Sequence, residues 1–327
     1  MPSNAADAVD VRALAPSAFD AFDVVLGAMA SAGPTRLLEL ARRRISMLLA
    51  AEGDAVTSVG SLDQSVIDSL SAWPTSPHFD ADDRATLELT EQFVIDVAGT
   101  SDDLRRRCFG QLGDRAFPLV QAIYVVDQGL RMRAALRQLF GAVDGAARPA
   151  TGGADLWPAI EEWTQAVARL DALDPLTAEL VRLRVARVHD CRLCRSRRHV
   201  AALADGGDES VFDQIDDYER SGLAEHQKVA LRLVDSMLWR PARLPEGLAT
   251  DALGLLGPAA ALEVVLDVGR NAANKIAVVF GADTAEVDEG WQPFEVDERG
   301  VVTTEVTGSS VSVRAAPGTG TRDHPEG

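Results

Sequence analysis

Apolar side chains recur at helical spacing along most of the 327 residues, and this periodicity restricts the chain to a helical fold. The range 225–239 is a clear case, because its apolar positions fall on one face of a helix: Val229, Ala230, Leu233, Val234, Met237 and Leu238. The ranges 83–97 and 259–280 have the same pattern. Alternating β-branched residues, typical of strands, occur only near 301–313. The sequence therefore predicts an all-α protein.

The helical pattern occurs twice. Residues 39–45 (ELARRRI) align with 179–185 (ELVRLRV) at an offset of 140, and 84–91 align with 228–235 at an offset of 144. Both halves close with a long helix that ends in Phe-Gly, at 140–141 and 280–281. We therefore expect two tandem duplicated helical repeats, over 15–150 and 151–295. A disordered arm (1–14) and a flexible, apolar-poor tail (296–327) would flank them.

Composition excludes several classes of protein. A formal net charge of −18 argues against binding to nucleic acid or to an anionic membrane surface, since both need clustered cations. No apolar run approaches the roughly 20 residues that span a bilayer. The first residues lack the basic and apolar regions of a secretory signal. Three cysteines are too few for a disulfide framework in a chain of this length, so we expect a cytoplasmic protein.

The residues with the most distinctive chemistry are Cys191 and Cys194. Asp190 is the predicted N-cap of a helix that ends near Gly206, which would place the two cysteines one turn apart on one face. Their sulfurs would then be close enough to form a disulfide, and the helix N-terminus would lower a thiol pKa. Seven arginines surround this segment, and we expect them to stabilise a thiolate and attract anionic substrates: Arg182, Arg184, Arg187, Arg192, Arg195, Arg197 and Arg198.

Spacing alone leaves three interpretations of the dithiol open. It is typical of a redox pair, of half a zinc site, or of two cysteines that only pack. Zinc could recruit His189 and His199, but His189 precedes the predicted cap and His199 lies about two turns beyond Cys191. Four ligands would then converge poorly. Cys108 has no partner in the sequence and is predicted to be a core residue.

A wider pattern resembles the alkylhydroperoxidase-D/carboxymuconolactone decarboxylase family over about residues 155–290. It consists of Glu179, eleven residues, the Cys191-x-x-Cys194 motif, and a downstream Asn271-x-x-Asn274-Lys275. The first half looks like a degenerate copy, with Ala51 and Asp54 in place of the cysteines. That family is all-α and oligomeric, and its peroxidase members reduce hydroperoxides with the dithiol.

The resemblance implies a role for each of these residues. Glu179 would be the base of a proton relay, Cys191 and Cys194 the redox pair, and the second cysteine the attacking one. The helix-dipole argument alone favours Cys191 as the attacking thiol. A thioredoxin-like or lipoyl protein would regenerate the dithiol, and no metal or flavin cofactor is implied. The asparagines would support neighbouring loops or line the pocket.

One departure from the family concerns the relay histidine, whose position holds Arg198 here. His199 follows, rotated about 100° around a helix. The relay is rebuilt from Arg198, His199 or His189, or it is lost. We therefore expect a homo-oligomeric, thiol-dependent oxidoreductase that reduces a peroxide or another small oxidised substrate. Two alternatives are decarboxylase or lactone chemistry, which would not need two thiols, and a non-catalytic helical scaffold.

Overall fold

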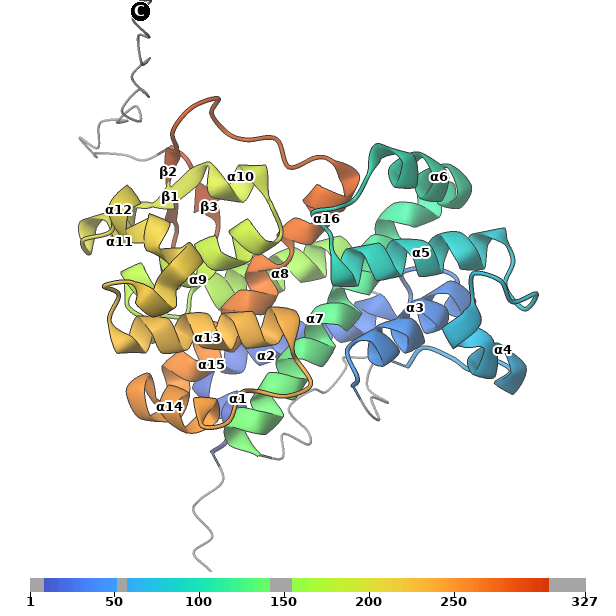
Figure 1. Cartoon of the computed structure of the whole chain (residues 1–327), viewed down its shortest axis with the longest axis horizontal. Helices are drawn as coiled ribbons and strands as arrows, with labels where there is room; N and C mark the ends of the chain where they lie inside the picture. Colours follow the sequence, from blue (N-terminus) through green and yellow to red (C-terminus); the bar gives the residue numbers. More distant parts are fainter. Residues whose placement is uncertain (1–8, 52–57, 142–154, 306–327) are drawn as a thin grey trace, which may run out of the picture.

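The computed structural model describes residues 9–51, 58–141 and 155–305. It is predominantly helical, as the periodicity predicted, with one small sheet (Figure 1). The long helix α7 (Ala116–Phe140) lies between two groups of helices, with residues 35–112 on one side and the second half together with residues 11–29 on the other. The two groups are packed against it and against each other, so the halves share one core.

The helices of the first half precede and include α7. Besides α7 they are α1 (Val11–Leu14), α2 (Pro16–Met29), α3 (Thr35–Leu48), α4 (Gln64–Ser69), α5 (Ala81–Ile95) and α6 (Asp102–Leu112). A capping box at Asp80 starts α5, because the carboxylates of Asp80 and Asp83 each accept the other residue's backbone N–H.

The second half contains longer helices and several short ones. They are α8 (Leu156–Ala168), α9 (Pro175–Val188), α10 (Arg192–Arg195), α11 (Val200–Ala204), α12 (Glu209–Phe212), α13 (Glu225–Trp239), α14 (Leu248–Leu255), α15 (Gly257–Asn271) and α16 (Asn274–Phe280). The predicted helix over 225–239 is confirmed at both ends. The helix predicted over 259–280 is broken after Asn271, where Lys275 and Ile276 donate to carbonyls only three residues back.

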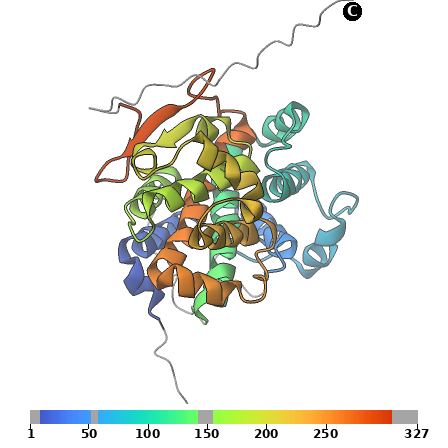
Figure 2. The same ribbon diagram turned by 60° about the vertical axis from the view of Figure 1, so that its left-hand side comes forward.

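The small sheet has the order β1-β2-β3 and lies on one face of the second half (Figure 2). Strand β1 (Arg197–His199) runs parallel to β2 (Gln292–Val296), with Arg198 opposite Pro293, and β2 pairs antiparallel with β3 (Val302–Thr303). The expectation of a tail from 296 onward is therefore wrong for residues up to 303. Of the strand pattern predicted near 301–313, residues 306–313 lie outside the described residues.

The predicted N-terminal arm is also too long. Residues 11–14 form α1, because the Asp10 carboxylate caps the start of this helix. Val11 is buried. Among the described helices, none alone is both long and apolar enough to cross a membrane. One sharply bent pair, Leu248–Leu255 with Gly257–Phe280, meets that test by length and composition only.

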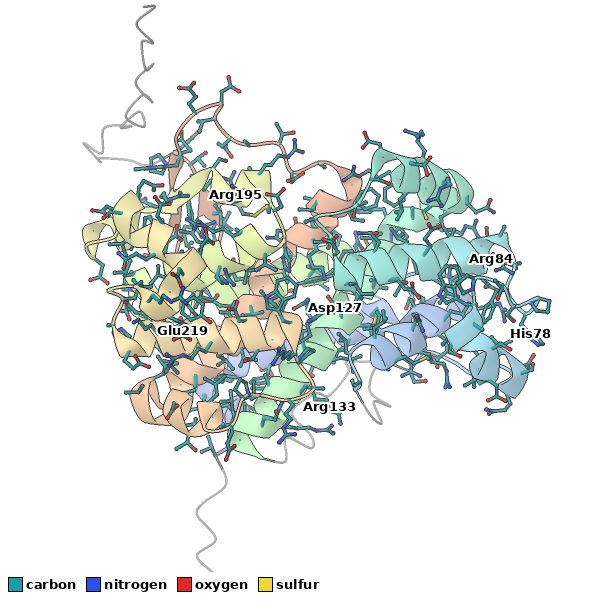
Figure 3. All side chains as sticks on the ribbon, viewed as in Figure 1. His78, Arg84, Asp127, Arg133, Arg195 and Glu219 are labelled. Carbon is teal, nitrogen blue, oxygen red and sulfur yellow. A yellow bond between two sulfur atoms is a disulfide. The ribbon has the colours of Figure 1, made fainter. Side chains whose placement is uncertain are left out.

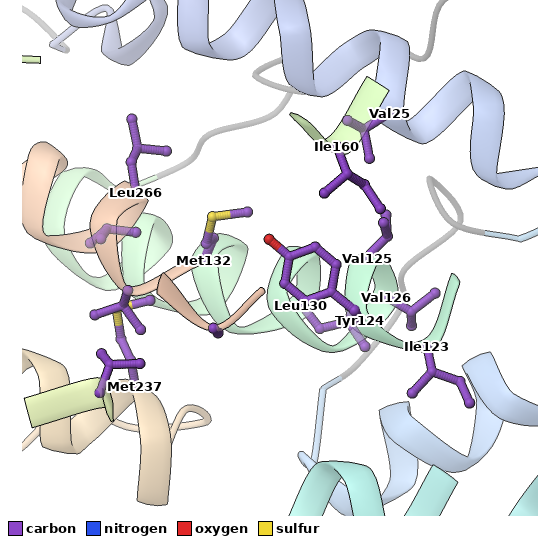
Figure 4. Close-up of a cluster of buried hydrophobic side chains, with 14 of the residues drawn as sticks. Val25, Ile123, Tyr124, Val125, Val126, Leu130, Met132, Ile160, Met237 and Leu266 are labelled. Carbon is purple, nitrogen blue, oxygen red and sulfur yellow. The ribbon is translucent and has the colours of Figure 1, made fainter. Parts of the chain in front are cut away.

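The core is built around α7, which is buried on most of its surface. Figure 4 shows its side chains, such as Tyr124 and Met132, among apolar residues of neighbouring helices. Helix α15 approaches α7 closely at Gly269, whose carbonyl accepts a hydrogen bond of 2.9 Å from the Tyr124 hydroxyl. A Cβ at Gly269 would lie 2.6 Å from the Met132 sulfur, so a larger residue there would force the Met132 side chain to shift.

Candidate functional site

Cys191 and Cys194 form a disulfide with a Cα–Cα distance of 5.3 Å, as the spacing predicted. Their surroundings differ, because Cys191 is 1% exposed whereas Cys194 is only partly buried. The Cys191 sulfur accepts a hydrogen bond of 3.2 Å from the Cys194 backbone N–H. Of the two sulfurs, Cys194 is therefore the more accessible to an incoming molecule.

The turn that presents the cysteines differs from the prediction. Asp190 is not the N-cap, because its φ of +49° places it in the left-handed region where it terminates α9. The Cys191 N–H closes that helix end by donating to the Ala186 carbonyl at 3.0 Å. Cys191 itself is the N-cap of α10, which has only four residues and leads into β1. The continuous helix expected from Cys191 to Gly206 is therefore interrupted by a strand.

A distant residue, Asp283, fixes this turn. Its carboxylate accepts the Arg192 backbone N–H at 2.9 Å and pairs with the Arg192 guanidinium at 2.8 Å, while its carbonyl accepts the Leu193 N–H at 3.0 Å. Asp283 is buried, whereas the Arg192 side chain is 57% exposed, so the ion pair lies at the surface and its acid faces inward. Sequence reasoning missed Asp283 because no local spacing connects it with the cysteines.

A polar pair contacts the accessible sulfur. The Asn274 side-chain N–H donates to the Cys194 sulfur at 3.6 Å, and the Asn274 side-chain oxygen lies 2.8 Å from His189 Nδ1. Burial lowers the pKa of His189 to about 3, with a smaller effect from the nearby Lys275 charge. A neutral His189 therefore donates through Nδ1 and orients the Asn274 amide so that its N–H groups face the sulfur.

Behind this pair lies a buried ionic cluster at the centre of the molecule, where Figure 3 labels Asp127. Lys275 pairs with Asp127 at 2.8 Å, and Arg131 pairs with the same carboxylate at 2.7 Å. Burial lowers the pKa of Lys275 to about 8, although Asp127 opposes the shift. The Arg131 guanidinium also donates to the Met237 and Val94 carbonyls, which ties the ends of α13 and α5 together.

Glu179 does not stand free beside the thiols. It is 2% exposed, and Arg182 binds both of its oxygens at 2.6 and 2.7 Å. Glu179 also accepts a hydrogen bond from the His199 backbone N–H at 3.3 Å. The Arg182 guanidinium donates a further hydrogen bond to the Cys194 carbonyl at 2.8 Å. The first half contains the same arrangement without cysteines beside it, in which Glu39 pairs with Arg42 at 2.7 Å and accepts the Val59 N–H at 3.5 Å.

The other two predicted site residues point elsewhere. The Arg198 side chain lies over the ring of Phe212. Its guanidinium pairs with Glu209 at 2.8 Å and donates to the Arg195 carbonyl. The His199 ring lies 5.0 Å from the ring of Phe294 on β2. Among the alternatives given for the relay, Arg198 and His199 therefore do not contact the dithiol in the described structure. His189, which sequence analysis gave as one alternative, is the histidine that reaches the Cys194 surroundings.

The seven arginines around the cysteines do not form the positively charged surface that the sequence predicted. Each of these arginines pairs with an acid, and five of those acids lie more than ten residues away or on another element. The pairs are Arg182–Glu179, Arg184–Asp235, Arg187–Asp216, Arg192–Asp283, Arg195–Asp190, Arg197–Glu286 and Arg198–Glu209. A groove of about 690 Å³ beside α10 contains four of these arginines, together with Asp213, Asp216 and Asp288. The arginines therefore hold the turn in place, and they leave little uncompensated positive charge.

Two further predictions concern cysteines and metals. Cys108 is 1% exposed, and burial raises the pKa of its thiol to about 11, so it is a core residue as predicted. Within residues 9–51, 58–141 and 155–305, no three His, Cys, Asp or Glu side chains are placed to hold a metal ion. Asp54, at the position matching Cys194, lies outside the described residues.

The fold and the site define a predominantly helical protein with a vicinal cysteine pair. The chain is 38% identical over 219 residues to the uncharacterized proteins Rv2313c and MT2376 of two Mycobacterium tuberculosis strains. The match covers 64% of this chain and 76% of each relative, so the chain belongs to the family of these mycobacterial proteins. No known family profile matches the chain. No solved structure matches it.

Proposed function

We propose that the protein is a thiol-dependent oxidoreductase that reduces a peroxide through Cys191 and Cys194. The observation that carries the proposal is the Cys191–Cys194 disulfide, in which the more accessible sulfur is contacted by the Asn274 amide and, through it, by His189. The resemblance to the alkylhydroperoxidase-D family supports the same reaction class.

The reaction would begin at Cys194. Its thiolate attacks one oxygen of a hydroperoxide, so that an S–O bond forms, the O–O bond breaks and the leaving alkoxide takes a proton to become an alcohol. The product on the protein is a sulfenic acid. Cys191 then attacks the Cys194 sulfur, and the S–S bond forms as hydroxide leaves and takes the Cys191 proton to become water. An external dithiol of the thioredoxin-like or lipoyl class would reduce the disulfide again.

In this proposal the Asn274 N–H stabilises the attacking thiolate, because hydrogen bonds to an ionised acceptor are stronger than neutral ones. His189 acts as a positioning residue that holds the amide in the useful orientation. We assign Glu179 a structural role, not a catalytic one. Its oxygens are occupied by Arg182 and by the His199 N–H, and the thiol-free first half repeats that contact around Glu39.

The element bounds support the expected duplication as part of the proposal. Helices α3 and α9 start and end 140 positions apart, and α5 and α13 start and end 144 apart. Ala50 and Asp190, also 140 apart, both have φ of +49°. An ion pair with an aromatic donor recurs as well, in Arg44–Glu91–Trp73 and in Arg184–Asp235–Tyr218. The first half would then be a packing partner that has no thiol chemistry.

The test identifies the attacking cysteine. Reduced Cys191→Ser protein is mixed with one equivalent of an organic hydroperoxide, and the sulfenic acid is trapped with a dimedone-type reagent and located by mass spectrometry. We expect the adduct on Cys194, and no peroxide consumption above background in Cys194→Ser protein. Equal consumption by wild type and by the protein lacking both cysteines would refute the proposal.

A further inference from the structure

A second candidate site is a cavity of about 190 Å³ between α9, α15 and β2. Neither cysteine lines it. Its polar lining comes from one residue between α8 and α9, two on α9, one on β1 and three on α15, namely Asp171, Glu179, Arg182, His199, Glu263, Asp267 and Arg270. The dithiol chemistry proposed above uses none of the three α15 side chains.

Two buried carboxyl groups in this cavity lack the partners that buried acids normally have. Glu263 is 4% exposed and accepts the N–H groups of Ala172 and Leu173 with one oxygen, at 2.6 and 3.2 Å. Asp267 is 6% exposed, and its nearest partner is the Arg270 guanidinium at 3.5 Å. The second oxygen of each carboxyl accepts no hydrogen bond from the residues that the structure describes. Neither oxygen is among the fully buried, unpaired side-chain atoms of the described residues, so both are open to a bound molecule or to water in the cavity that these residues line.

Asp127 on α7 shows what a structural buried acid looks like in this protein. It is also buried, but Lys275, Arg131 and the Gln128 side chain all bind it, at 2.8, 2.7 and 2.9 Å. Burial alone would raise the pKa of Asp127, yet the Arg131 and Lys275 charges bring it below its usual value. Asp267 lies 140 positions further along the chain and has no comparable cation.

Arg270 supplies the opposite charge. Its side chain is only 17% exposed, and the long contact with Asp267 is the one ion pair it makes within the described part of the chain. Its remaining N–H groups are available to bind an anion, and guanidinium suits a carboxylate in particular. The cavity therefore contains carboxylate oxygens that can accept hydrogen bonds and guanidinium N–H groups that can donate them, all on α15. Phe294 forms one wall.

We propose that this cavity binds a small organic zwitterion of amino-acid size, with its carboxylate on Arg270 and its ammonium group between Glu263 and Asp267. A volume of about 190 Å³ holds about six water molecules, which is room for a molecule with few non-hydrogen atoms. A simple cation would face Arg182 and Arg270, and a simple anion would face the carboxyl groups. A zwitterion satisfies both. The site does not depend on the redox proposal.

The titration of the carboxyl groups gives the expected pH dependence. Burial raises the pKa of Glu263 to about 8, helped by the Asp267 charge, and burial raises the pKa of Asp267 to about 6 against the effect of Arg270. An ammonium ion binds the ionised carboxylates, so affinity should increase as the pH rises from about 6 to about 8. The other charged or titratable groups around the cavity are Asp171, Glu179, Arg182 and His199.

The first experiment uses the wild-type protein and three matched probes, namely L-alanine, ethylamine and propionate, in calorimetric titration and thermal unfolding. We expect L-alanine to bind at least about tenfold more tightly than either fragment, because each fragment leaves one charge of the site unpaired. Equal affinity for L-alanine and ethylamine, or no binding of L-alanine, would overturn the proposal. Peroxide consumption by the same sample is measured separately, so failure of one proposal does not imply failure of the other.

The second experiment compares Asp267→Asn with Glu162→Gln, an exposed acid on α8. Asp267→Asn should reduce L-alanine affinity at least about tenfold and raise Tm without ligand, because it removes a poorly compensated buried charge. Glu162→Gln should change neither quantity. A lower Tm for Asp267→Asn, with unchanged affinity, would show that Asp267 is structural and would contradict the proposal.

Discussion

The contact between Asn274 and Cys194 can be tested by replacing Asn274 with leucine, which has a similar size but no donor. A hydrogen bond to an ionised group contributes about 1.5–3 kcal/mol. The N···S distance of 3.6 Å and the partial exposure of Cys194 favour the lower end of that range. A loss of about 1.4 kcal/mol raises the Cys194 thiol pKa by about one unit. The thiolate fraction then falls about tenfold at any pH below the thiol pKa.

The rate of alkylation falls less than the thiolate fraction does. A thiolate of higher pKa is intrinsically more nucleophilic, by about threefold per unit. Asn274→Leu should therefore slow alkylation about three- to fourfold at low pH and speed the limiting rate at high pH about threefold. The background for both measurements is protein with Cys108→Ser and Cys191→Ser, so that Cys194 is the remaining cysteine.

The assay is the pH profile of iodoacetamide alkylation, with thiolate absorbance as a second measure of the pKa. Asn271→Leu is the matched control, because its amide lies one turn earlier and donates to the Asp267 carbonyl at 2.9 Å. An unchanged Cys194 pKa in Asn274→Leu, or an equal shift in the control, would refute the assignment.

Three further predictions address other parts of the account. Glu179→Gln should cost about 3 kcal/mol or more in the free energy of unfolding, measured by urea titration, because it leaves Arg182 unpaired in a buried site; Glu39→Gln should cost a similar amount. Neither should change the rate with peroxide, and a drop of about 10²-fold for Glu179→Gln alone would restore that residue as a base. Cys108→Ser should leave the rate of peroxide reduction unchanged when it is followed by stopped-flow, since the thiol is buried and protonated. The pKa of His189 is lowered to about 3 in the folded state, below its unfolded value near 6.5. The free energy of unfolding should therefore fall as the pH decreases from about 6.5 toward 3, by about 1.4 kcal/mol per pH unit. His189→Gln should remove that slope, and an unchanged slope in urea titrations would contradict a buried neutral ring.

The helical fold could be predicted because apolar periodicity is a local property of the sequence. The bounds of α13 match the prediction over Glu225–Trp239, and α5 differs by two residues at each end. The break between α15 and α16 could not be predicted, since no proline lies at it and the partners of Asn274, which are Cys194 and His189, are distant in the sequence. Strand β1 was missed for a similar reason, because its Arg-Arg-His sequence is extended only through pairing with β2 nearly a hundred residues later.

The cysteine pair was found from the sequence because its spacing is itself the signal. The side chains that surround the pair could not be predicted in the same way. The seven arginines suggest a cationic surface when counted along the sequence, but acids such as Asp283 and Glu286 neutralise them in three dimensions. The same limit applies to His189, whose partner Asn274 lies on another helix. Charge compensation and hydrogen bonding in the core depend on tertiary contacts, and local patterns carry little information about them.

The central claim is that Cys191 and Cys194 form a working redox pair, and rapid mixing of the reduced protein with an organic hydroperoxide tests it most directly. The reaction is followed by stopped-flow, quenched with an alkylating reagent and analysed by mass spectrometry of the intact chain. The account predicts a fast, peroxide-dependent loss of two hydrogens, with Cys191 and Cys194 both blocked to alkylation and Cys108 unchanged. Free alkylation of Cys191 and Cys194 after exposure to peroxide would contradict it.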